Sequence, residues 1–418
     1  MEKEADNRMG APILSRLDRL RPRALDAPVP RAQDLPMRLI TQTEDLRAFC
    51  GAVSEEPFLA VDTEFMREST YWPKLCLIQA ASANHEAVID PLAQGIDLQP
   101  FLDVMGNEAV LKVFHAARQD LEIFLNLAGA LPTPMFDTQI GAMACGYGDS
   151  IAYDALVQIM LKRRLDKSSR FTDWSRRPLS EAQLSYALAD VTHLRDLYPR
   201  MAQRLDKDGR RDWVAEELSQ LTDPAIYDTS PEMSWRRLKF RKTVPDYVLA
   251  LKTAAAWRER QAQTRDVPRG RIVKDDAIYE IAEQRPKAPA DFDRMRAVPR
   301  GFGNSRAAAE LLADLQRALA EPDRSAHRIE RGPPMPAGAG PTVELLKVLL
   351  RYEAERHQVA PRLIASVADL EALAADDDAD VQALKGWRRD VFGARALALK
   401  HGQLALKLKD GKVIVVED

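Results

Sequence analysis

Short hydrophobic runs alternate with helical patterns in the first half of the chain. Runs rich in β-branched or apolar residues predict strands at 58–64, 75–80, 87–90 and 110–114. Apolar residues at helical spacing predict helices at 46–53, 98–105 and 120–127. Beyond residue 137 the spacing is helical alone, with candidates at 138–145, 153–160 and 181–205. Strands with helices between and after them indicate an α/β domain that ends near residue 210.

The second half of the chain has a helical pattern throughout. Helix candidates separated by Pro and Gly loops lie at 245–263, 275–282, 290–295 and 306–320. A flexible connector rich in Pro and Gly is predicted at 332–340. A further helical stretch runs from 342 to about 400. The tail at 403–417 alternates apolar and polar residues around Asp410-Gly411, which predicts a terminal hairpin.

These patterns divide the chain into six segments. We expect a mobile extension (1–36), an α/β domain (37–210), a linker (211–240), a first helical block (241–325), a Pro/Gly linker (326–340) and a second helical block with the hairpin (341–418). A weak repeat links the two blocks, because the pairs Pro268-Arg269 and Pro361-Arg362 lie 93 residues apart. Duplication of one helical module explains this, and chance similarity is the alternative. Either Met1 or Met37 could be the first residue of the mature protein.

Composition narrows the class of protein. The chain has 418 residues, of which 46% are hydrophobic and 29% charged, as in ordinary globular proteins. It has no apolar run of about 18 residues, so we expect no membrane span. The three cysteines form no CxxC pair, which argues against a disulfide scaffold and a Cys-rich zinc site. The extension lacks an apolar signal segment and holds too many acids for a transit peptide, so we expect a cytoplasmic protein.

Candidate chemistry begins with Asp62 and Glu64 in the first predicted strand. Residues two apart in a strand point to one face, where two carboxylates repel unless a divalent cation lies between them. A strand end emerging into solvent is the alternative for this pair. Asp120 opens a later predicted helix, and by itself it fits better as an ordinary acid in a first helical turn. Tyr186 and Asp190 lie one turn apart on one helix face, where a simple Tyr–Asp hydrogen bond is the alternative.

The ordered set of these motifs is more specific than any one of them. A DxE strand, an Asp opening a helix and a YxxxD helix resemble the DEDD superfamily of 3′–5′ exonucleases, in its tyrosine-containing branch. The flanking sequences VDTEFMRESTYWPKLCLIQ (61–79), FDTQ (136–139), DWSRRPL (173–179) and ADVTHL (189–194) look like the ribonuclease D family. The helical blocks resemble its HRDC modules, and the match is good at VPRGRIVKDD (267–276). The second block lacks much of this basic loop.

The resemblance implies a fold, an activity and a metal site. The fold would be α/β, a ribonuclease H-like mixed-sheet exonuclease domain followed by two all-α HRDC-type domains. The activity would be two-metal hydrolysis of RNA from its 3′ end, releasing nucleoside 5′-monophosphates and trimming tRNA precursors. Oxygen ligands without His or Cys favour two Mg²⁺ or Mn²⁺ ions over zinc. By family analogy Asp62 bridges both ions, Glu64 and Asp190 complete the first, Asp120 holds the second through water, and Tyr186 orients the attacking water.

Other residues are candidates for RNA contacts or for structural roles. Phe65 and Met66 follow Glu64 and could stack on the terminal base, with core packing as the alternative. Gln79 is a candidate for the terminal-nucleotide pocket. His115 is a candidate RNA contact that fits better as a strand-end hydrogen-bonding residue, and Asp137 fits better as a helix N-cap than as a direct substrate contact. Residues 231–300 hold 17 Lys and Arg against 10 Asp and Glu. This excess predicts an RNA platform in the first block, through residues that include Arg269 and Arg271. Lys162, Arg163, Arg164, Lys167 and Arg170 could grip phosphates in the same way.

Two other functions stay open at this point. The same catalytic fold could act on DNA, although the chain has no GxxxxGK[ST] phosphate-binding loop of a helicase. A non-catalytic RNA-binding adaptor would be expected to lack one of the four acids or the tyrosine, and all five are present. We expect a monomer that binds RNA and no membrane.

Overall fold

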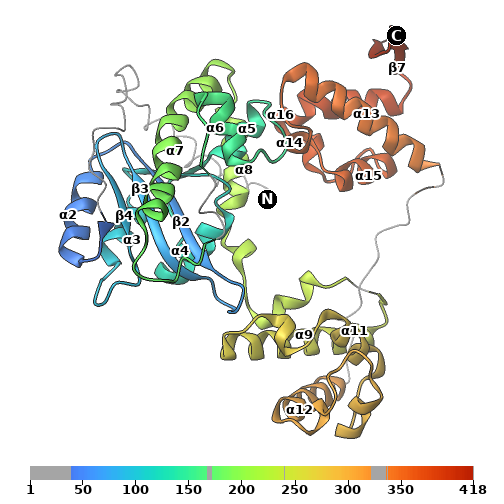
Figure 1. Cartoon of the computed structure of the whole chain (residues 1–418). Helices are drawn as coiled ribbons and strands as arrows, with labels where there is room; N and C mark the ends of the chain where they lie inside the picture. The colour runs from blue at the N-terminus through green and yellow to red at the C-terminus, as the bar shows by residue number, and fades with distance from the viewer. Residues whose placement is uncertain (1–38, 167–171, 240, 322–335, 337, 418) are drawn as a thin grey trace, which may run out of the picture. The chain divides into compact units, whose positions relative to one another are not determined.

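The computed structural model describes residues 39–166, 172–239, 241–321, 336 and 338–417 (Figure 1). The predicted extension (1–36), most of the Pro/Gly linker, Lys167 and Arg170 lie outside the described residues. The chain forms two compact units. One unit contains Met1–Glu64, Cys76–Asp223 and Met335–Asp418, and the other contains Phe65–Leu75 and Pro224–Pro334.

A six-stranded mixed sheet forms the centre of the first unit, which confirms the predicted fold class. Its strands run in the order β1-β4-β3-β2-β5-β6. They are β1 (Leu39–Ile40), β2 (Phe58–Met66), β3 (Lys74–Ala81), β4 (Glu86–Ile89), β5 (Leu111–Phe114) and β6 (Met135–Asp137). The pairs β1–β4, β2–β5 and β5–β6 are parallel, and β3–β4 is antiparallel. The four predicted strands are confirmed, while β1 and β6 are too short for a periodic signal.

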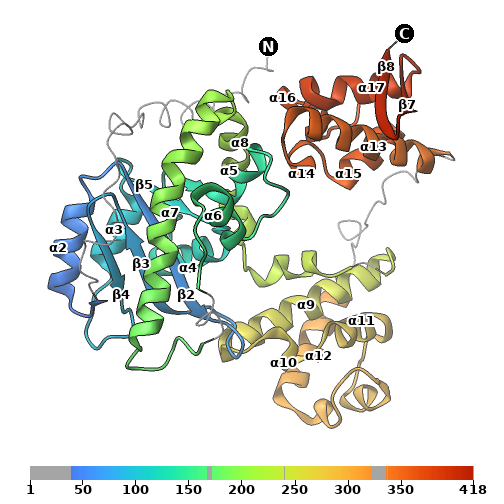
Figure 2. The same cartoon turned by 45° about the horizontal axis from the view of Figure 1, so that its top comes forward.

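Seven helices of the first unit accompany this sheet. They are α2 (Thr43–Val53), α3 (Gln99–Gly106), α4 (Arg118–Ala128), α5 (Thr138–Ala144), α6 (Tyr153–Leu161), α7 (Glu181–Lys207) and α8 (Arg211–Leu221). Helix α7 packs against β4 and β5, with α5, α6 and α8 beside it (Figure 2). A capping box at Ser180 and Gln183 starts α7, and Arg204 and Lys207 complement the dipole in its last turn. All the helices that the pattern predicts in this unit are present.

Helix α8 lies in the segment that the sequence predicts as a linker (211–240). Its buried residues Val214, Ala215 and Leu218 face the rest of the first unit, and the helix packs against α5 and β6. Burying such an apolar stripe is the main source of stability for a short helix. This part of the expected linker therefore contributes to the core of the first unit.

The first helical block is built around the long helix α9. Its elements are the 3-10 turns η2 (Pro224–Tyr227) and η3 (Pro231–Arg237), helices α9 (Pro245–Arg265), α10 (Arg269–Ile272) and α11 (Asp275–Gln284), turns η4 (Pro289–Arg294) and η5 (Phe302–Asn304), and helix α12 (Arg306–Leu319). Trp257, Ile278 and Leu311 are completely or almost completely buried in its core. The helix predicted at 290–295 is a 3-10 turn that begins with Pro289.

The second helical block repeats the beginning of the first. Its elements are α13 (Ala339–His357), α14 (Pro361–Ile364), α15 (Val367–Ala375), η7 (Gln382–Leu384), α16 (Gly386–Arg388), η8 (Arg389–Gly393), α17 (Ala394–Lys400), β7 (Leu404–Lys409) and β8 (Lys412–Glu417). The strands form the predicted hairpin, with Asp410 and Gly411 at φ 50° and 74°. No helix among the described residues has the length and apolar character needed to cross a membrane.

The backbone supports the repeat but shifts its register. Helices α9 and α13 both end at a residue in the left-handed conformation, Asp266 at φ 47° and Gln358 at φ 51°. These caps lie 92 residues apart, and a four-residue helix begins three residues after each. Pro268 therefore corresponds to Ala360, so the two Pro-Arg pairs are offset by one residue.

The second block packs against α8 within the first unit. The guanidinium of Arg388, which is 2% exposed, donates to the carboxylates of Glu216 and Glu217. The rings of Trp213 and Trp387 stack with centroids 3.9 Å apart. Arg210 donates to the carbonyl oxygens of His357 and Gln358. These contacts make the second block a fixed part of its unit.

Candidate metal centre

The central strand β2 brings two carboxylates to the middle of the sheet. Its residues from Phe58 to Val61 are buried, which is typical of a strand covered on both faces. From Asp62 the burial alternates, with Thr63 buried and Asp62 and Glu64 partly exposed. Because side chains two apart share a face, both carboxylates project to the same side of the sheet. The predicted DxE geometry is present.

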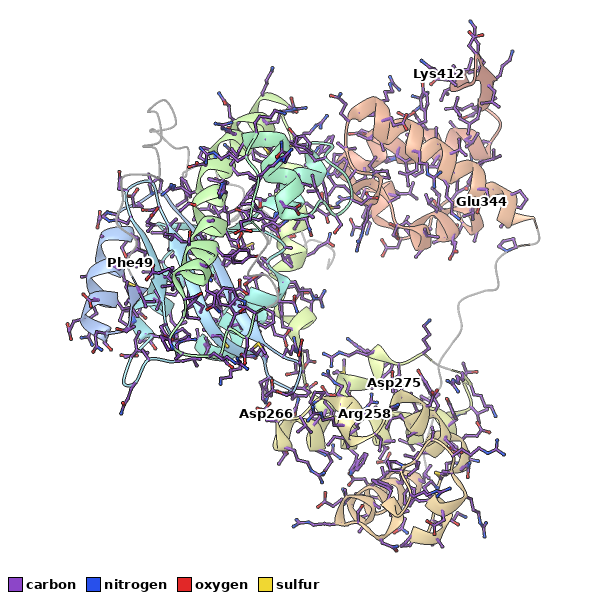
Figure 3. All side chains as sticks on the ribbon, viewed as in Figure 1. Phe49, Arg258, Asp266, Asp275, Glu344 and Lys412 are labelled. Atoms are coloured by element: carbon purple, nitrogen blue, oxygen red, sulfur yellow. The ribbon has the colours of Figure 1, made fainter. Side chains whose placement is uncertain are left out.

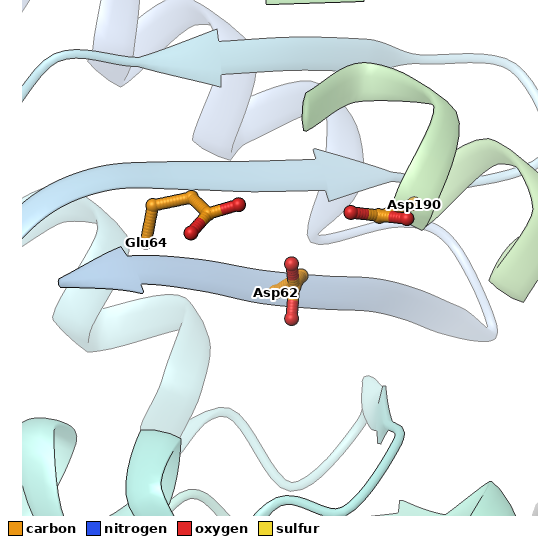
Figure 4. Close-up of side chains that lie close together, drawn as sticks. All are labelled: Asp62, Glu64 and Asp190. Carbon is orange, nitrogen blue, oxygen red and sulfur yellow. The ribbon is translucent and has the colours of Figure 1, made fainter. Parts of the chain in front are cut away.

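Helix α7 adds a third carboxylate to this pair. Oxygens of Asp62, Glu64 and Asp190 all lie within 4.8 Å of one another (Figure 4). Figure 4 shows the first two residues on one strand and Asp190 on the helix that faces it. Residues about 130 positions apart along the chain thus converge on one place, as the order of the motifs predicts.

Burial and mutual repulsion raise the pKa of each carboxyl in this cluster. Burial and then the charge of Asp190 raise the pKa of Asp62 to about 8. Burial, followed by the charges of the neighbouring acids, raises the pKa of Glu64 to about 9. For Asp190 burial raises the pKa to about 7. A cluster that resists its own ionisation is stabilised by a cation, and its all-oxygen ligand set fits Mg²⁺ or Mn²⁺.

The fourth predicted acid, Asp120, lies next to this cluster but outside the 4.8 Å group. It is in the first turn of α4 and is 7% exposed. The hydroxyl of Thr63 donates to its Oδ1 atom at 2.5 Å. Burial and then the charge of Asp62 raise the pKa of Asp120 well above its usual value. The carboxylate therefore belongs to the same electrostatic environment, and Thr63 fixes its orientation.

Tyr186 lies on α7 one turn before Asp190, as the spacing predicts. Its ring centroid is 6.1 Å from that of Trp174. The segment that carries Trp174 is fastened to the sheet, since Arg177 donates to both carboxylate oxygens of Asp90 and to the carbonyl of Cys76. The segment 173–179, whose sequence resembles the family, thus contacts Tyr186 through Trp174 and lies outside the acid cluster.

Sequence reasoning missed one residue beside the cluster, Tyr153. Its hydroxyl donates to the backbone carbonyl of Asp190 and so links the first turn of α6 to the acid-bearing turn of α7. The ring of His115 lies 5.1 Å from that of Tyr153, and its Nδ1 lies 3.0 Å from the Thr138 hydroxyl. A lone tyrosine at a helix start carries no pattern, so no signal in one sequence could have identified it.

The residues with expected structural roles are found in those roles. Asp137 is the N-cap of α5 and accepts from the amide of Gln139, as predicted. It also accepts from the amides of Ala116 and Ala117, which fixes the turn between β5 and α4. The hydrogen bond between Nδ1 of His115 and the hydroxyl of Thr138 fits the favoured role of His115 at the end of a strand, and its alternative role as an RNA contact stays a prediction.

The expected RNA contacts differ in how accessible they are. Phe65 and Met66 are partly exposed directly after Glu64, and Arg271 is exposed. Arg269 forms an ion pair with Glu259 and is 29% exposed. The side chain of Gln79 is completely buried, and neither of its amide atoms has a hydrogen-bond partner among the described residues. RNA binding by these residues stays a prediction, and for Gln79 it would require an opening of the sheet's packing.

Comparison with known proteins gives a consistent picture. The family described as "3'-5' exonuclease" matches residues 37–206, and the HRDC domain matches residues 250–314. A protein named ribonuclease D from Nitrobacter hamburgensis is 54% identical over 381 residues, covering 91% of this chain and 100% of the relative. Another from Granulibacter bethesdensis is 49% identical, covering 90% and 95%. The crystal structure of Escherichia coli RNase D, described as an exoribonuclease involved in structured RNA processing, matches with a TM-score of 0.76 at 28% identity, covering 88% and 99%.

Proposed function

The chain belongs to the ribonuclease D family and is a metal-dependent 3′–5′ exoribonuclease, and on that premise we propose that it trims the 3′ ends of tRNA precursors. We further propose that Asp62, Glu64 and Asp190 hold the catalytic cations. The observation that carries this assignment is the group of three carboxylates with oxygens within 4.8 Å of one another. The proposal includes action in the cytoplasm as a monomer.

By family analogy, Glu64 and Asp190 would hold one cation together with Asp62, and Asp62 would also hold a second cation, to which Asp120 would bind through water. Four carboxylates carry a charge of about −4, which two divalent ions balance, so that an RNA phosphate can approach. When bound, two such ions activate water and stabilise the leaving 3′ oxygen. The raised pKa values of these acids support the assignment, because they report a site that is electrostatically incomplete by itself.

The side chains around the carboxylates position the reactants. A phenol with a pKa near 10 is a poor base at neutral pH, so Tyr186 orients the attacking water and relays a proton. Thr63 holds the carboxylate of Asp120, and Tyr153 holds the backbone of Asp190. Such supporting contacts keep reacting groups in a narrow range of geometry, which hydrolysis requires. Phe65 and Met66 contact the terminal base in this proposal.

The RNA substrate also contacts a surface remote from the reaction. We assign this contact to the first helical block, because residues 231–300 carry a net charge of +7. Arg271 is exposed in the loop that resembles the HRDC motif. Lys and Arg that neutralise phosphates release counterions, so binding through this block should weaken steeply with salt. The second block is a weaker candidate, because residues 341–418 hold 12 Lys and Arg against 13 Asp and Glu.

One assay tests the proposal against its alternatives. Matched RNA and DNA strands labelled at the 5′ end are incubated with the full chain in Mg²⁺, in Mn²⁺ and in EDTA. We expect shortening of the RNA from its 3′ end with either ion, nucleoside 5′-monophosphates as products, and no shortening in EDTA. Faster shortening of DNA would support the DNA-directed alternative. RNA binding without hydrolysis in any metal would support the adaptor.

The specific substrate needs a second comparison. A tRNA precursor with a 3′ trailer is compared with a mature tRNA and with an unstructured RNA of equal length. We expect the highest kcat/KM for the precursor. Equal kcat/KM for all three would leave a general exoribonuclease and contradict the tRNA assignment.

A further inference from the structure

A buried carboxylate in the first helical block binds three neighbouring groups. Glu259 in α9 has no exposed side-chain surface. The guanidinium of Arg269 donates to both of its oxygens, and Arg237 lies 3.2 Å from Oε1. The third partner is the hydroxyl of Tyr71, which donates to the same Oε1 atom. Two of these groups belong to the helical block, whereas Tyr71 comes from the segment Phe65–Leu75, which includes the connection from β2 to β3.

The contacts of Tyr71 extend beyond this one hydrogen bond. Its hydroxyl also accepts from Gln263 at 3.1 Å and from Arg269 at 2.9 Å. The guanidinium of Arg269 lies over its ring, 4.7 Å from the centroid. The backbone amides of Tyr71 and Trp72 both donate to the carboxylate of Asp266. Asp266, which is labelled in Figure 3, is the residue that ends α9. All these residues belong to the second unit.

The charge of Glu259 makes this attachment strong. Burial favours the neutral acid, but hydrogen bonds from Arg269 and Tyr71 and the charges of the arginines hold the pKa of Glu259 below its usual value. Glu259 is therefore ionised at neutral pH, and an ionised buried carboxylate requires all its donors. Removing the hydroxyl of Tyr71 would take away one of the hydrogen-bond donors to Glu259. The connecting segment is thus attached to the helical block by charge-assisted hydrogen bonds rather than by loose surface contacts.

The same segment begins with the last two residues of the acid-bearing strand β2, Phe65 and Met66. Phe65 is the next residue after Glu64, and the segment ends at Leu75 in β3. The residues between the two strands (67–73) are all within four positions of Tyr71. A segment held at its middle cannot move its ends freely, so the anchor limits the motion of Phe65 and Met66.

We propose that Tyr71 and Glu259 are positioning residues for RNA hydrolysis, which act by holding the segment that starts with Phe65 and Met66. The inference rests on the proposed function and deepens it, because it gives the first helical block a role in turnover as well as in RNA binding. It has a distinct consequence. Hydrolysis of an oligonucleotide too short to occupy the basic surface should still depend on this anchor.

The test uses three full-length variants and a trinucleotide RNA substrate. Tyr71→Phe removes only the hydroxyl, and Glu259→Gln removes the charge at nearly constant shape. Tyr279→Phe is the matched control, because Tyr279 also lies under an arginine and binds a backbone amide with its hydroxyl, but it contacts Arg241 and Lys239 instead. We expect kcat on the trinucleotide to fall roughly tenfold in the first two variants with KM unchanged, as for a modest misplacement of reacting groups. The control should behave like the parent chain.

Hydrogen exchange and thermal unfolding separate positioning from a loss of folding. Amides of residues 65–75 should exchange faster in Tyr71→Phe and Glu259→Gln, with Tm close to that of the parent. Phenylalanine at 71 retains the ring under Arg269, so this variant keeps the inference testable if Glu259→Gln unfolds. Unchanged kcat on the trinucleotide in Tyr71→Phe would overturn the inference, as would an equal loss in Tyr279→Phe. If the parent chain hydrolyses no RNA, the proposed function fails, which is a different result.

Discussion

Replacing Asp190 with Asn should stabilise the metal-free protein and at the same time abolish its response to Mg²⁺. Oxygens of Asp62, Glu64 and Asp190 lie within 4.8 Å of one another. At an effective dielectric constant near 20, two unit charges at this separation repel by about 3 kcal/mol. Asparagine has almost the same shape as aspartate, so the variant removes the repulsion and retains the packing.

The size of this stabilisation depends on pH, because the acids in the cluster have raised pKa values. A carboxyl whose pKa is higher in the folded state than in the unfolded state stabilises the fold at low pH and loses that contribution as pH rises through its folded value. Here the loss begins near the ordinary carboxyl pKa of about 4 and is complete only as pH passes the folded values of about 7 for Asp190, 8 for Asp62 and 9 for Glu64. At pH 8 the cluster still holds part of its protons. We therefore expect the free energy of unfolding of Asp190→Asn to exceed that of the parent by about 1–3 kcal/mol.

Thermal unfolding at pH 8, in EDTA and across a Mg²⁺ titration, measures both effects. The expected result for Asp190→Asn is a higher Tm in EDTA, no rise of Tm with Mg²⁺ and no RNA hydrolysis. Asp196→Asn is the matched control on the same helix, because Asp196 pairs with Arg163 and Arg195. The control should not raise Tm in EDTA, and its Tm should rise with Mg²⁺. A lower Tm of Asp190→Asn in EDTA, or a rise with Mg²⁺ equal to that of the parent, would refute the reasoning.

Four further predictions follow from the same contacts. Tyr186→Phe should lower kcat about a hundredfold while RNA affinity and the Mg²⁺-dependent rise of Tm stay unchanged; an unaltered kcat would remove this hydroxyl from the reaction. Tyr153→Phe should weaken Mg²⁺ binding about tenfold in a calorimetric titration, because the backbone of Asp190 loses a support; unchanged affinity would contradict that role. The Tm of the metal-free parent should fall between pH 7 and 9 as the acids ionise, and saturating Mg²⁺ should reverse the fall; a flat profile would contradict the raised pKa values. Arg388→Met should lower the free energy of unfolding by about 3 kcal/mol in urea, since it leaves two partly buried carboxylates of α8 without their partner; a loss within error of zero would show that the second block is not fixed to α8.

Much of the fold and of the candidate metal site could be predicted from the sequence, because the strands and helices that carry the acids leave periodic signals. The strand that carries Asp62 and Glu64 is a long apolar run, and two carboxylates at its end are costly without a cation. Asp190 is likewise conspicuous among the apolar residues of α7. The terminal hairpin could be predicted because Asp410-Gly411 is a strong turn signal between two alternating runs.

The remaining features depend on contacts between distant residues that have no periodic signal. The hydrogen bond from Tyr153 to Asp190 joins residues 37 positions apart, and the bond from Tyr71 to Glu259 joins residues 188 positions apart. Helix α8 follows α7 after a short turn and is stabilised by packing, which a local reading of residues 211–240 could not show. The repeat could be recognised from its Pro-Arg pairs, but its register of 92 required the left-handed caps at Asp266 and Gln358.

The binding of paired cations is the central claim, and anomalous scattering from crystals grown with Mn²⁺ tests it most directly. We expect two Mn²⁺ peaks about 4 Å apart, one contacted by Asp62, Glu64 and Asp190 and the other by Asp62 and, through water, Asp120. Asp62→Asn crystals grown under the same conditions should lose the second peak and weaken the first. The absence of any Mn²⁺ peak within bonding distance of Asp62 and Asp190 in the parent crystals would contradict the account.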